Sequence, residues 1–507
     1  MEQKVGIMGY GVCIPIERVP TAEIVKRREA RRKDLDELLA KVRDGLLLRY
    51  KSVANYSEDT TTIATEATEN ALRMAQVDPK LIRSVAVGTE SKPYAVGLAA
   101  RHVASFTGMG DNVFVADLEG ACNAGMQAVT YIMGQIKSGT IDYGVAVGSD
   151  VSQAPIRDAL EYSAGAGAGA FVLGREELVA TIEDMAPFSS LSLDFWRRDE
   201  MLVPKHFGRT TVEVYTYHVV GAMEELLRRH PGLKISDFDY ITFHQPSGYM
   251  PLKVCKALAQ PNIEVGCDPT VRDRLRISQE DIEKKVKPWF TVLETGNTYA
   301  ASTPIAIATI LDKAKPGEDI LAVSYGSGAY TIATWLRVEE AINKKSRLVP
   351  GVQEYVSHRR EIDFATYGSY LAERTRRMKK RLAYPRIVAE VEPAGEEQIE
   401  ILICLGCNRV YYPVRSKCLQ YGCKGPLEKL VLPRRARLKG LKDLPLRRKR
   451  TLDCNVLKEG GVFIVDAKNE ELKPGIELES VVRRLDYEGS DGLIIYGPCY
   501  RPLFRDK

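Results

Sequence analysis

Short apolar runs alternate with helix-like apolar periods along the first 345 residues. Runs of strand character occupy 5–10, 85–88 and 144–148, whereas 61–74 repeats apolar residues at helical spacing. Strands that alternate with helices are typical of a layered α/β fold. The pattern therefore predicts an α/β fold for this part of the chain.

The second half of this region repeats the pattern of the first. An apolar strand is predicted at 240–243, a helix just before Asn297, and a sheet-closing run over 320–338. The stretches GVAVGSD (144–150) and LAVSYGSG (321–328) look like equivalent strand-to-loop units. We therefore predict a duplicated domain with halves at 1–175 and 176–350.

Beyond residue 350 the pattern changes twice. Residues 351–400 are charged and helix-prone, which is typical of a solvated connector. A compact cysteine-containing unit follows at 401–430, and strand-like runs at 462–465, 476–482 and 492–496 predict a small antiparallel β-barrel over 431–507.

Composition narrows the class of protein. The 507 residues are 45% hydrophobic and 27% charged, which is ordinary for a globular chain of several domains. The apolar runs are too short to span a membrane, and the first residues run into a strand without a leader pattern, so we expect a cytoplasmic protein. A net charge of +5 does not imply general nucleic-acid binding.

Four cysteines cluster in the pattern C-x2-C-x10-C-x4-C. Two such knuckles can present four thiolates to one tetrahedral ion, and an all-sulfur set favours a structural Zn²⁺, with iron as the main competitor. The plainer interpretation is four buried free thiols. The predicted ligands are Cys404, Cys407, Cys418 and Cys423.

A basic run follows the cysteine cluster. Residues 433–450 hold nine Lys or Arg and one acidic residue, Asp443. A zinc ribbon beside a basic run raises a nucleic-acid hypothesis, but the run lacks aromatic residues for base stacking. We favour the interpretation that the basic run binds the phosphates of a coenzyme A substrate or an acidic partner.

Three residues lie just after predicted strands, where α/β folds usually place their functional side chains. Cys122 lies between a strand-like run and a helix, where the helix N-terminus favours a thiolate, although a small buried cysteine would fit the same turn. His244 ends an apolar strand, and Glu90 follows a strand and precedes a Pro/Gly loop. Together they suggest a nucleophile with acid/base partners.

The motifs GYGVCIP, SEDTTTIATEAT, VGTESKPYAVG, ACNAG, DFWRRD, HQPSG, GNTYAAS and SYGSGA occur in the order of the archaeal-type 3-hydroxy-3-methylglutaryl-CoA synthases. The resemblance to this branch of the thiolase superfamily spans about residues 4–370. The last part resembles the zinc-ribbon and OB-fold proteins that accompany archaeal thiolases and synthases, although their usual second C-x2-C is C-x4-C here.

The resemblance implies a layered α-β-α-β-α thiolase fold and a two-stage reaction of coenzyme A thioesters. Cys122 would accept an acetyl group, Glu90 would remove its methyl proton, and His244 would donate a hydrogen bond to the acceptor ketone. Backbone N–H groups of Cys122 and Ser327 would form an oxyanion hole, and Asn297 would position the second thioester. A homodimer is also implied, with a separate thiolase as a candidate docking partner.

Three departures from the family pattern keep other interpretations open. Gly120 and Asn123 flank the nucleophile where a Phe-Ala-Cys-Lys pattern is usual, and Phe207 replaces a glycine. A roomier or differently polar pocket would suit a thiolase-superfamily acyltransferase or thiolase that acts on aryl or branched acyl-CoA esters in a multi-subunit complex. A non-catalytic scaffold is a third hypothesis, which the intact catalytic set opposes.

Overall fold

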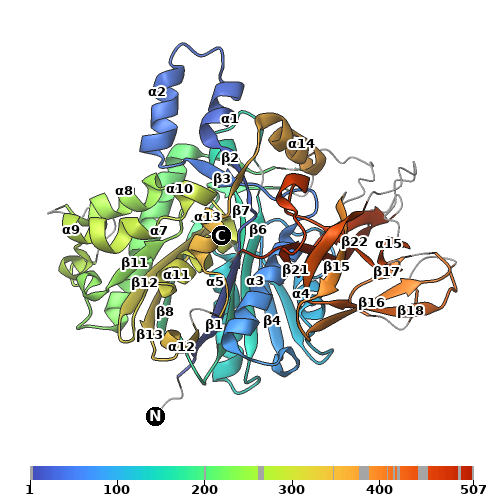
Figure 1. The fold of residues 1–507 in the computed structure, drawn as a ribbon. Helices are drawn as coiled ribbons and strands as arrows, with labels where there is room; N and C mark the ends of the chain where they lie inside the picture. The colour runs from blue at the N-terminus through green and yellow to red at the C-terminus, as the bar shows by residue number, and fades with distance from the viewer. Residues whose placement is uncertain are drawn as a thin grey trace. The chain divides into compact units, whose positions relative to one another are not determined.

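A nine-stranded sheet forms the centre of the first of two compact units, which comprises Met1–Ala54 and Ile63–Thr375 (Figure 1). The computed structural model describes residues 4–504 except 153, 199–200, 202, 261–267, 346–347, 376–386, 408, 415–416, 419–422, 443–454, 459 and 489–492. The predicted division into five parts stays a prediction.

The strands of both halves hydrogen-bond into this one sheet. Their order is β11 (Tyr240–Phe243), β12 (Asp319–Gly326), β13 (Gly328–Val338), β8 (Ala180–Ser192), β1 (Gly6–Cys13), β7 (Ala166–Gly174), β6 (Gly144–Val151), β4 (Ser84–Gly88) and β5 (Phe114–Leu118). Strand β8 joins the halves because it pairs with both β1 and β13. The predicted α/β class is confirmed.

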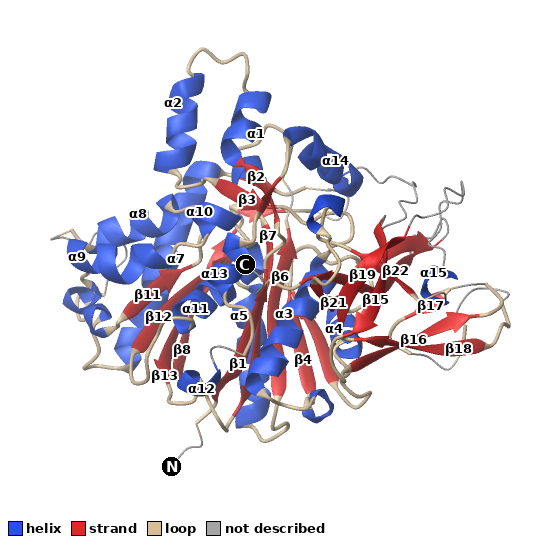
Figure 2. Cartoon of the chain, viewed as in Figure 1, coloured by secondary structure: helices blue, strands red, loops and turns tan. Residues whose placement is uncertain are grey.

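Helices pack on the sheet at points where small residues allow close approach (Figure 2). A Cβ atom on Gly9 would lie 2.3 Å from the backbone nitrogen of Ala75, and one on Gly11 would lie 2.3 Å from the oxygen of Ala67. Because Gly9 and Gly11 have no side chain, α3 can pack closely against β1. The main packed helices are α3 (Thr60–Ala75), α4 (Ala99–Phe106), α5 (Ala124–Lys137), α7 (Gly208–Arg229), α8 (Tyr249–Leu258) and α11 (Ser302–Leu311).

Shorter elements complete the first unit. A three-stranded sheet has the order β14 (Arg360–Glu361), β2 (Glu17–Pro20) and β3 (Tyr50–Ser52), and β9 (Phe195–Trp196) pairs with β10 (Lys205–His206). The remaining helices are α1 (Thr21–Arg28), α2 (Leu35–Ala40), α6 (Leu160–Ser163), α9 (Gln279–Asp281), α10 (Val292–Thr295), α12 (Ile342–Lys345), α13 (Val352–Ser357) and α14 (Phe364–Thr375).

The second unit contains a closed five-stranded barrel. Its strands are β15 (Ile387–Pro393), β19 (Arg435–Lys442), β21 (Glu477–Glu488), β22 (Leu493–Pro502) and β20 (Gly461–Ile464), with the short helix α15 (Asn455–Lys458). The predicted wholly antiparallel barrel is wrong in one respect, because β20 and β22 pair in parallel and so close the barrel. A three-stranded sheet of β17 (Val410–Tyr411), β16 (Gln398–Cys404) and β18 (Leu427–Pro433) lies between β15 and β19 in the sequence.

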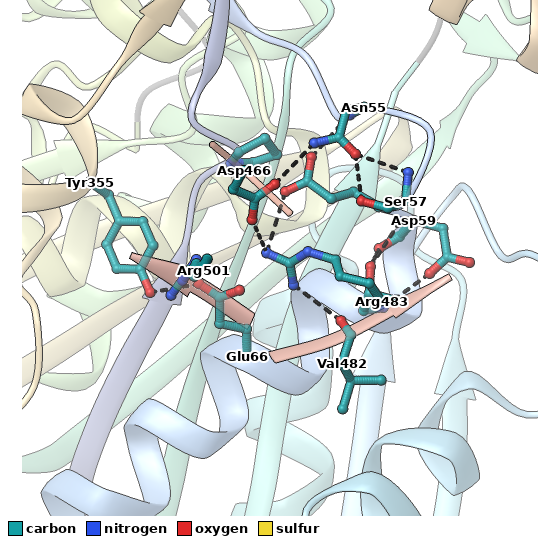
Figure 3. Close-up of polar contacts among 12 residues, drawn as sticks. Asn55, Ser57, Asp59, Glu66, Tyr355, Asp466, Val482, Arg483 and Arg501 are labelled. Atoms are coloured by element: carbon teal, nitrogen blue, oxygen red, sulfur yellow. Dashed lines mark hydrogen bonds and ion pairs between the residues drawn. The ribbon is translucent and has the colours of Figure 1, made fainter. Parts of the chain in front are cut away.

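Residues Asn55–Thr62 belong to this second unit, although their neighbours in sequence belong to the first. The backbone N–H of Arg484 donates to the oxygen of Ser57 at 2.8 Å. The fully buried Arg483 guanidinium lies 2.8 Å from Asp466 and 3.7 Å from Glu58 (Figure 3). The unit is therefore built from two separate stretches of sequence.

No helix in the described part of the chain combines the length and the apolar character that crossing a bilayer requires.

Candidate functional site

Cys122 and Glu90 lie together because the strands that precede them are parallel neighbours. Glu90 follows β4, Cys122 follows β5, and the carboxyl ends of parallel strands share one edge of a sheet. The Cys122 thiol donates a hydrogen bond to Oε1 of Glu90 at a distance of 3.4 Å. The candidate nucleophile and a carboxyl group thus meet at this edge.

The turn before the nucleophile is tight. Ala121 has a φ of 49°, a left-handed conformation that is uncommon for a residue with a side chain. Helix α5 begins three residues later, at Ala124, and approaches β4 closely, since a Cβ on Gly88 would lie 2.1 Å from the oxygen of Ala124. This geometry places Cys122 at the junction of β5 and α5, as the sequence predicted.

A second carboxyl group, Asp150, supports Glu90 from β6, which is the other parallel neighbour of β4. Oδ1 of Asp150 accepts hydrogen bonds from the backbone N–H of Glu90 at 2.8 Å and from the hydroxyls of Thr89 and Ser91 at 2.9 and 2.6 Å. Oδ2 accepts from the Ala300 N–H at 2.9 Å. Sequence reasoning missed this residue, although it ends the GVAVGSD strand.

Burial and neighbouring charges keep protons in this cluster. Burial raises the pKa of the Cys122 thiol well above its usual value, and the charges of Glu90 and Asp150 raise it further. Desolvation, followed by the charge of Asp150, raises the pKa of Glu90. The thiolate expected from the helix N-terminus is therefore not the resting form of Cys122, because burial of the thiol, followed by the neighbouring carboxyl charges, outweighs the effect of the helix.

His244 directly follows β11, which runs parallel to β12. Its ring is buried, stacks 6.5 Å from the ring of Tyr325, and has an Nδ1 atom without a hydrogen-bond partner among the described residues. Burial lowers the pKa of His244 to about 3. The imidazole is therefore neutral at physiological pH, and it has one ring N–H to donate.

Ser327 follows β12 and belongs to a loop that packs on the nucleophile's turn. A Cβ on Gly326 would lie 2.1 Å from the oxygen of Gly120, so only glycine fits there. The Ser327 hydroxyl donates to Oδ2 of Asp194 at 3.3 Å, and the charge of Asp194 also raises the pKa of Cys122. Asp194, which the sequence reasoning did not single out, therefore lies near both loops.

Asn297 is held on both sides by backbone. Its N–H donates to the oxygen of Ser163 at 2.6 Å, and its oxygen accepts from the Gly165 N–H at 2.8 Å. Its Oδ1 accepts from the Tyr299 N–H at 2.8 Å. Tyr299 packs in a small cluster with Cys122, so the structure brings Asn297 into the same neighbourhood.

The departures from the family pattern have different structural outcomes. A Cβ on Gly120 would lie 2.1 Å from the Gln127 side chain, so Gln127 occupies the space that a larger residue would need. Asn123 is fully buried, and its amide has no partner among the described residues. Phe207 is 58% exposed and packs its ring 4.9 Å from that of Trp196.

The cysteine cluster forms in the second unit. One sulfur atom from each of the four residues lies within 4.8 Å of the others, and the Cys404–Cys423 and Cys407–Cys418 sulfur pairs are 3.5 and 3.6 Å apart. Tetrahedral Zn–S bonds of about 2.3 Å require sulfur separations of this size. The four residues therefore fit a single tetrahedral ion.

Comparison with known proteins shows which family the chain is similar to. The family model "Thiolase, N-terminal domain" matches residues 51–184. The hydroxymethylglutaryl-CoA synthase of Methanothermobacter thermautotrophicus is 40% identical over 366 residues, covering 72% of this chain and 97% of that protein. The corresponding synthase of Pyrococcus furiosus is 38% identical over 72% of this chain and 95% of its own length.

Solved structures share the fold. MvaS in complex with 3-hydroxy-3-methylglutaryl coenzyme A superimposes with a TM-score of 0.65 at 22% identity, over 73% of this chain and 92% of that one. An HMG-CoA synthase complexed with CoA gives 0.62 at 19% identity, over 78% and 95%. From the sequence relatives above all, we conclude that the chain belongs to the hydroxymethylglutaryl-CoA synthase family.

Proposed function

We propose that the chain condenses acetyl-CoA with acetoacetyl-CoA and water to form 3-hydroxy-3-methylglutaryl-CoA and free CoA. As a member of this family it is an acyl-CoA condensing transferase that uses coenzyme A thioesters. One observation carries the proposal: the thiol of Cys122 lies 3.4 Å from the carboxyl of Glu90 in a desolvated cluster.

The first half-reaction uses this pair. In its ionised form Glu90 accepts the thiol proton while the Cys122 sulfur attacks the thioester carbonyl of acetyl-CoA, and the departing CoA thiolate takes that proton. Glu90, ionised again, then removes a methyl proton of the acetyl-cysteine. A desolvated carboxylate with a raised pKa suits this step, because its basicity is closer to that of the carbon acid.

The second half-reaction joins the enolate to the acceptor. The enolate carbon attacks the ketone of acetoacetyl-CoA, the neutral His244 donates a hydrogen bond to the developing oxyanion, and the proton held on Glu90 neutralises it. The backbone N–H groups of Cys122 and Ser327 would stabilise the oxyanion at the acyl-cysteine carbonyl. Asn297 would position the acceptor thioester, and water would hydrolyse the product from Cys122.

The alternative substrate class is an aryl or branched acyl-CoA ester used by a thiolase-type acyltransferase. Gly120 motivated that alternative through the space it would leave, but Gln127 occupies this space. The buried amide of Asn123 still places an uncharged polar group beside the nucleophile where the family pattern has a lysine. Standard synthase activity is therefore the function that we favour.

The test is intact-protein mass spectrometry after incubation with a panel of acyl-CoA esters. Acetyl-CoA should add one acetyl group to the wild-type chain and to Cys255→Ala, which removes another fully buried cysteine, but not to Cys122→Ala. Loading of Cys122→Ala would refute the assignment of the nucleophile. Preferential loading of a branched or aryl group would favour the alternative substrate class.

The cysteine cluster is proposed to hold one structural Zn²⁺ through Cys404, Cys407, Cys418 and Cys423. Four thiolates leave no open position on a tetrahedral ion, so the metal would stabilise the fold and take no part in condensation. Elemental analysis of the full chain should give one zinc per chain. The Cys407→Ser/Cys418→Ser variant should lose zinc, whereas Cys499→Ala, at a buried cysteine of the barrel, should keep it.

Several properties of the whole protein stay proposals. The barrel and the three-stranded sheet would be an OB-fold with a zinc ribbon, and the protein would act in the cytoplasm.

A homodimer would form along β5, because this edge strand of the large sheet has a half-exposed Phe114 and edge strands readily pair with other chains. A separate thiolase stays a candidate partner, and light scattering with and without it tests both assemblies.

The basic run is proposed to attract coenzyme A phosphates or an acidic partner. Only its first part, up to residue 442, is described, and residues 443–450 lie outside the described residues. Arg435, Arg437 and Lys439 stand at alternate positions of β19 with exposed side chains, and Arg437 and Lys439 lie 3.5 and 3.8 Å from Glu477 and Glu390, so the described part adds little net positive charge to the strand face. Negligible binding of a random DNA duplex at physiological salt is the expected result.

A further inference from the structure

Two polar residues at the end of β3, Lys51 and Ser52, are buried although the chemistry above does not use them. Their exposed fractions are 4% and 1%. Burying a hydroxyl and an ammonium group costs free energy unless both find partners, so their contacts indicate what they stabilise.

The hydroxyl of Ser52 bridges two segments of backbone. It accepts a hydrogen bond from the Ala166 N–H at 3.0 Å, and it lies 2.9 Å from the oxygen of Thr295. The two segments are close enough there that a Cβ on Gly165 would lie 2.2 Å from that same Thr295 oxygen. Ser52 therefore ties the start of β7 to the end of α10.

The ammonium group of Lys51 contacts the same region one residue earlier. Its Nζ donates to the backbone oxygen of Glu161 at 2.7 Å and to the hydroxyl of Tyr367 at 3.0 Å. The backbone at Gly296, where φ is 69°, packs closely against the Lys51 side chain, because a Cβ on Gly296 would lie 2.9 Å from Cβ of Lys51. Lys51 thus supports the turn that presents Asn297.

These two segments are the ones that hold Asn297. Residues 163–165 form the hydrogen bonds to its backbone N–H and oxygen, and Ala164 and Asn297 form an isolated parallel bridge. Ala164 is also part of the Cys122 cluster. The position of the Asn297 side chain therefore depends on the backbone of these two segments. Lys51 and Ser52 stabilise that backbone through their hydrogen bonds.

We propose that Lys51 and Ser52 are positioning residues that act through Asn297 and set the binding of the acceptor thioester. This proposal rests on the proposed function, because Asn297 is placed there at the second substrate. Neither residue touches the nucleophile or Glu90, which β4 and β5 hold. The acyl-loading step should therefore be spared when either residue is changed.

The charge on Lys51 adds a pH dependence. Burial lowers its pKa to about 7, the charge of Glu161 opposes this shift, and that of Arg28 adds to it. The groups that face the amine are the Glu161 carboxylate, which Arg28 binds at 2.8 Å, and the Tyr367 hydroxyl on α14. Above about pH 7 the amine loses its charge, so its hydrogen bonds weaken and the Asn297 turn is held less firmly.

The experiment uses the full chain and the variants Ser52→Ala and Lys51→Met. Lys345→Met is the matched control, because Lys345 is another buried lysine with a lowered pKa, whose Nζ donates to the oxygens of Met8 and Glu177. The readouts are acetyl loading of Cys122, the KM for acetoacetyl-CoA between about pH 6 and 8.5, and hydrogen exchange of residues 163–166 and 295–298.

We expect Ser52→Ala and Lys51→Met to load acetyl normally but to raise the KM for acetoacetyl-CoA about 10- to 100-fold, because small misplacements of a binding group have effects of this size. The KM of the wild-type chain should rise as pH passes about 7, whereas the Lys51→Met value should show no such rise. Exchange in both segments should be faster in these two variants and unchanged in Lys345→Met.

An unchanged KM with unchanged exchange would overturn the proposal, as would an equal KM increase in Lys345→Met. If the wild-type chain fails to condense acetoacetyl-CoA, the proposed function fails, and the exchange comparison still decides whether Lys51 and Ser52 hold the Asn297 turn. Faster exchange at that turn in Ser52→Ala alone would assign the positioning role to Ser52 and remove Lys51 from it.

Discussion

At the scale of single residues, the central feature is a carboxyl group that resists ionisation beside a thiol that also resists it. Glu90 and Cys122 share one hydrogen bond, and Asp150 lies behind Glu90 with four donors of its own. Burial raises the pKa of Asp150, but its four donors oppose the shift, so the pKa of Asp150 stays below that of Glu90 and protons in this cluster reside on Glu90 and Cys122. A carboxyl group with a raised pKa suits the two proton transfers proposed for Glu90, the first from the Cys122 thiol and the second from the acetyl methyl group.

We predict that Glu90→Gln abolishes exchange of the acetyl methyl protons with solvent deuterium. Glutamine keeps the shape of the side chain but cannot take a proton, and loss of a general base costs about 10²- to 10⁴-fold in rate. The same variant should load acetyl more slowly, since the thiol then lacks its proton acceptor. Mass spectrometry of the acyl-enzyme in deuterium oxide measures both effects.

The pH dependence of this exchange follows from the raised pKa. A base with a raised pKa is protonated over more of the acidic range, so wild-type exchange should fall with decreasing pH well above the usual carboxyl range of about 4. Glu119→Gln, a change of an exposed carboxylate on the loop that carries Cys122, is the control and should leave exchange intact. Wild-type exchange in Glu90→Gln would remove Glu90 from the mechanism.

At the scale of elements, the site depends on loops of the two halves packing backbone against backbone. We predict that Gly326→Ala lowers condensation at least about 100-fold, because its Cβ would lie 2.1 Å from the oxygen of Gly120 and the two loops must separate. Gly134→Ala in α5 is the control. It has open space around its Cβ position, so it should leave activity intact and raise the free energy of unfolding by about 0.5–1 kcal/mol.

Melting temperature and the rate of condensation, measured for both variants, separate the two effects. A fully active Gly326→Ala enzyme would show that the loops tolerate separation and that Ser327 does not contribute through its backbone.

The sequence predicted these elements well where local pattern determines them. Strand β11 was predicted with its observed bounds because an apolar run marks it, and a helix was predicted after Cys122, where α5 begins, because a turn signal precedes it. Asp150 and Asp194 were missed, since their role comes from neighbours that are far away in the sequence and close only across the sheet. The protonated Cys122 thiol was also missed, because its desolvation arises only when both halves are folded.

At the scale of the whole molecule, the chain is longer than its match to the synthases named above, which spans 366 residues. Relatives that are covered to 95–97% of their length match only 72% of this chain. The second unit nevertheless includes Asn55–Thr62, a segment of the part that carries the synthase motifs. Tyr496 of β22 donates to Asp59 at 2.8 Å, which adds to the contacts of Arg483 and Arg484.

These contacts predict that the barrel and residues 55–62 unfold together. Arg483→Met should destabilise the second unit by about 3–5 kcal/mol, because it leaves the carboxylates of Asp466 and Glu58 buried without their cation. The matched control is Arg437→Met, which removes a largely exposed pair with Glu477 and should cost about 0–1 kcal/mol. Hydrogen exchange of the full chain should be faster in both 55–62 and 477–502 in Arg483→Met and unchanged in Arg437→Met. Faster exchange in 477–488 and 493–502 without a change in 55–62 would show that residues 55–62 fold independently of the barrel, and the unit would then comprise only Arg376–Lys507.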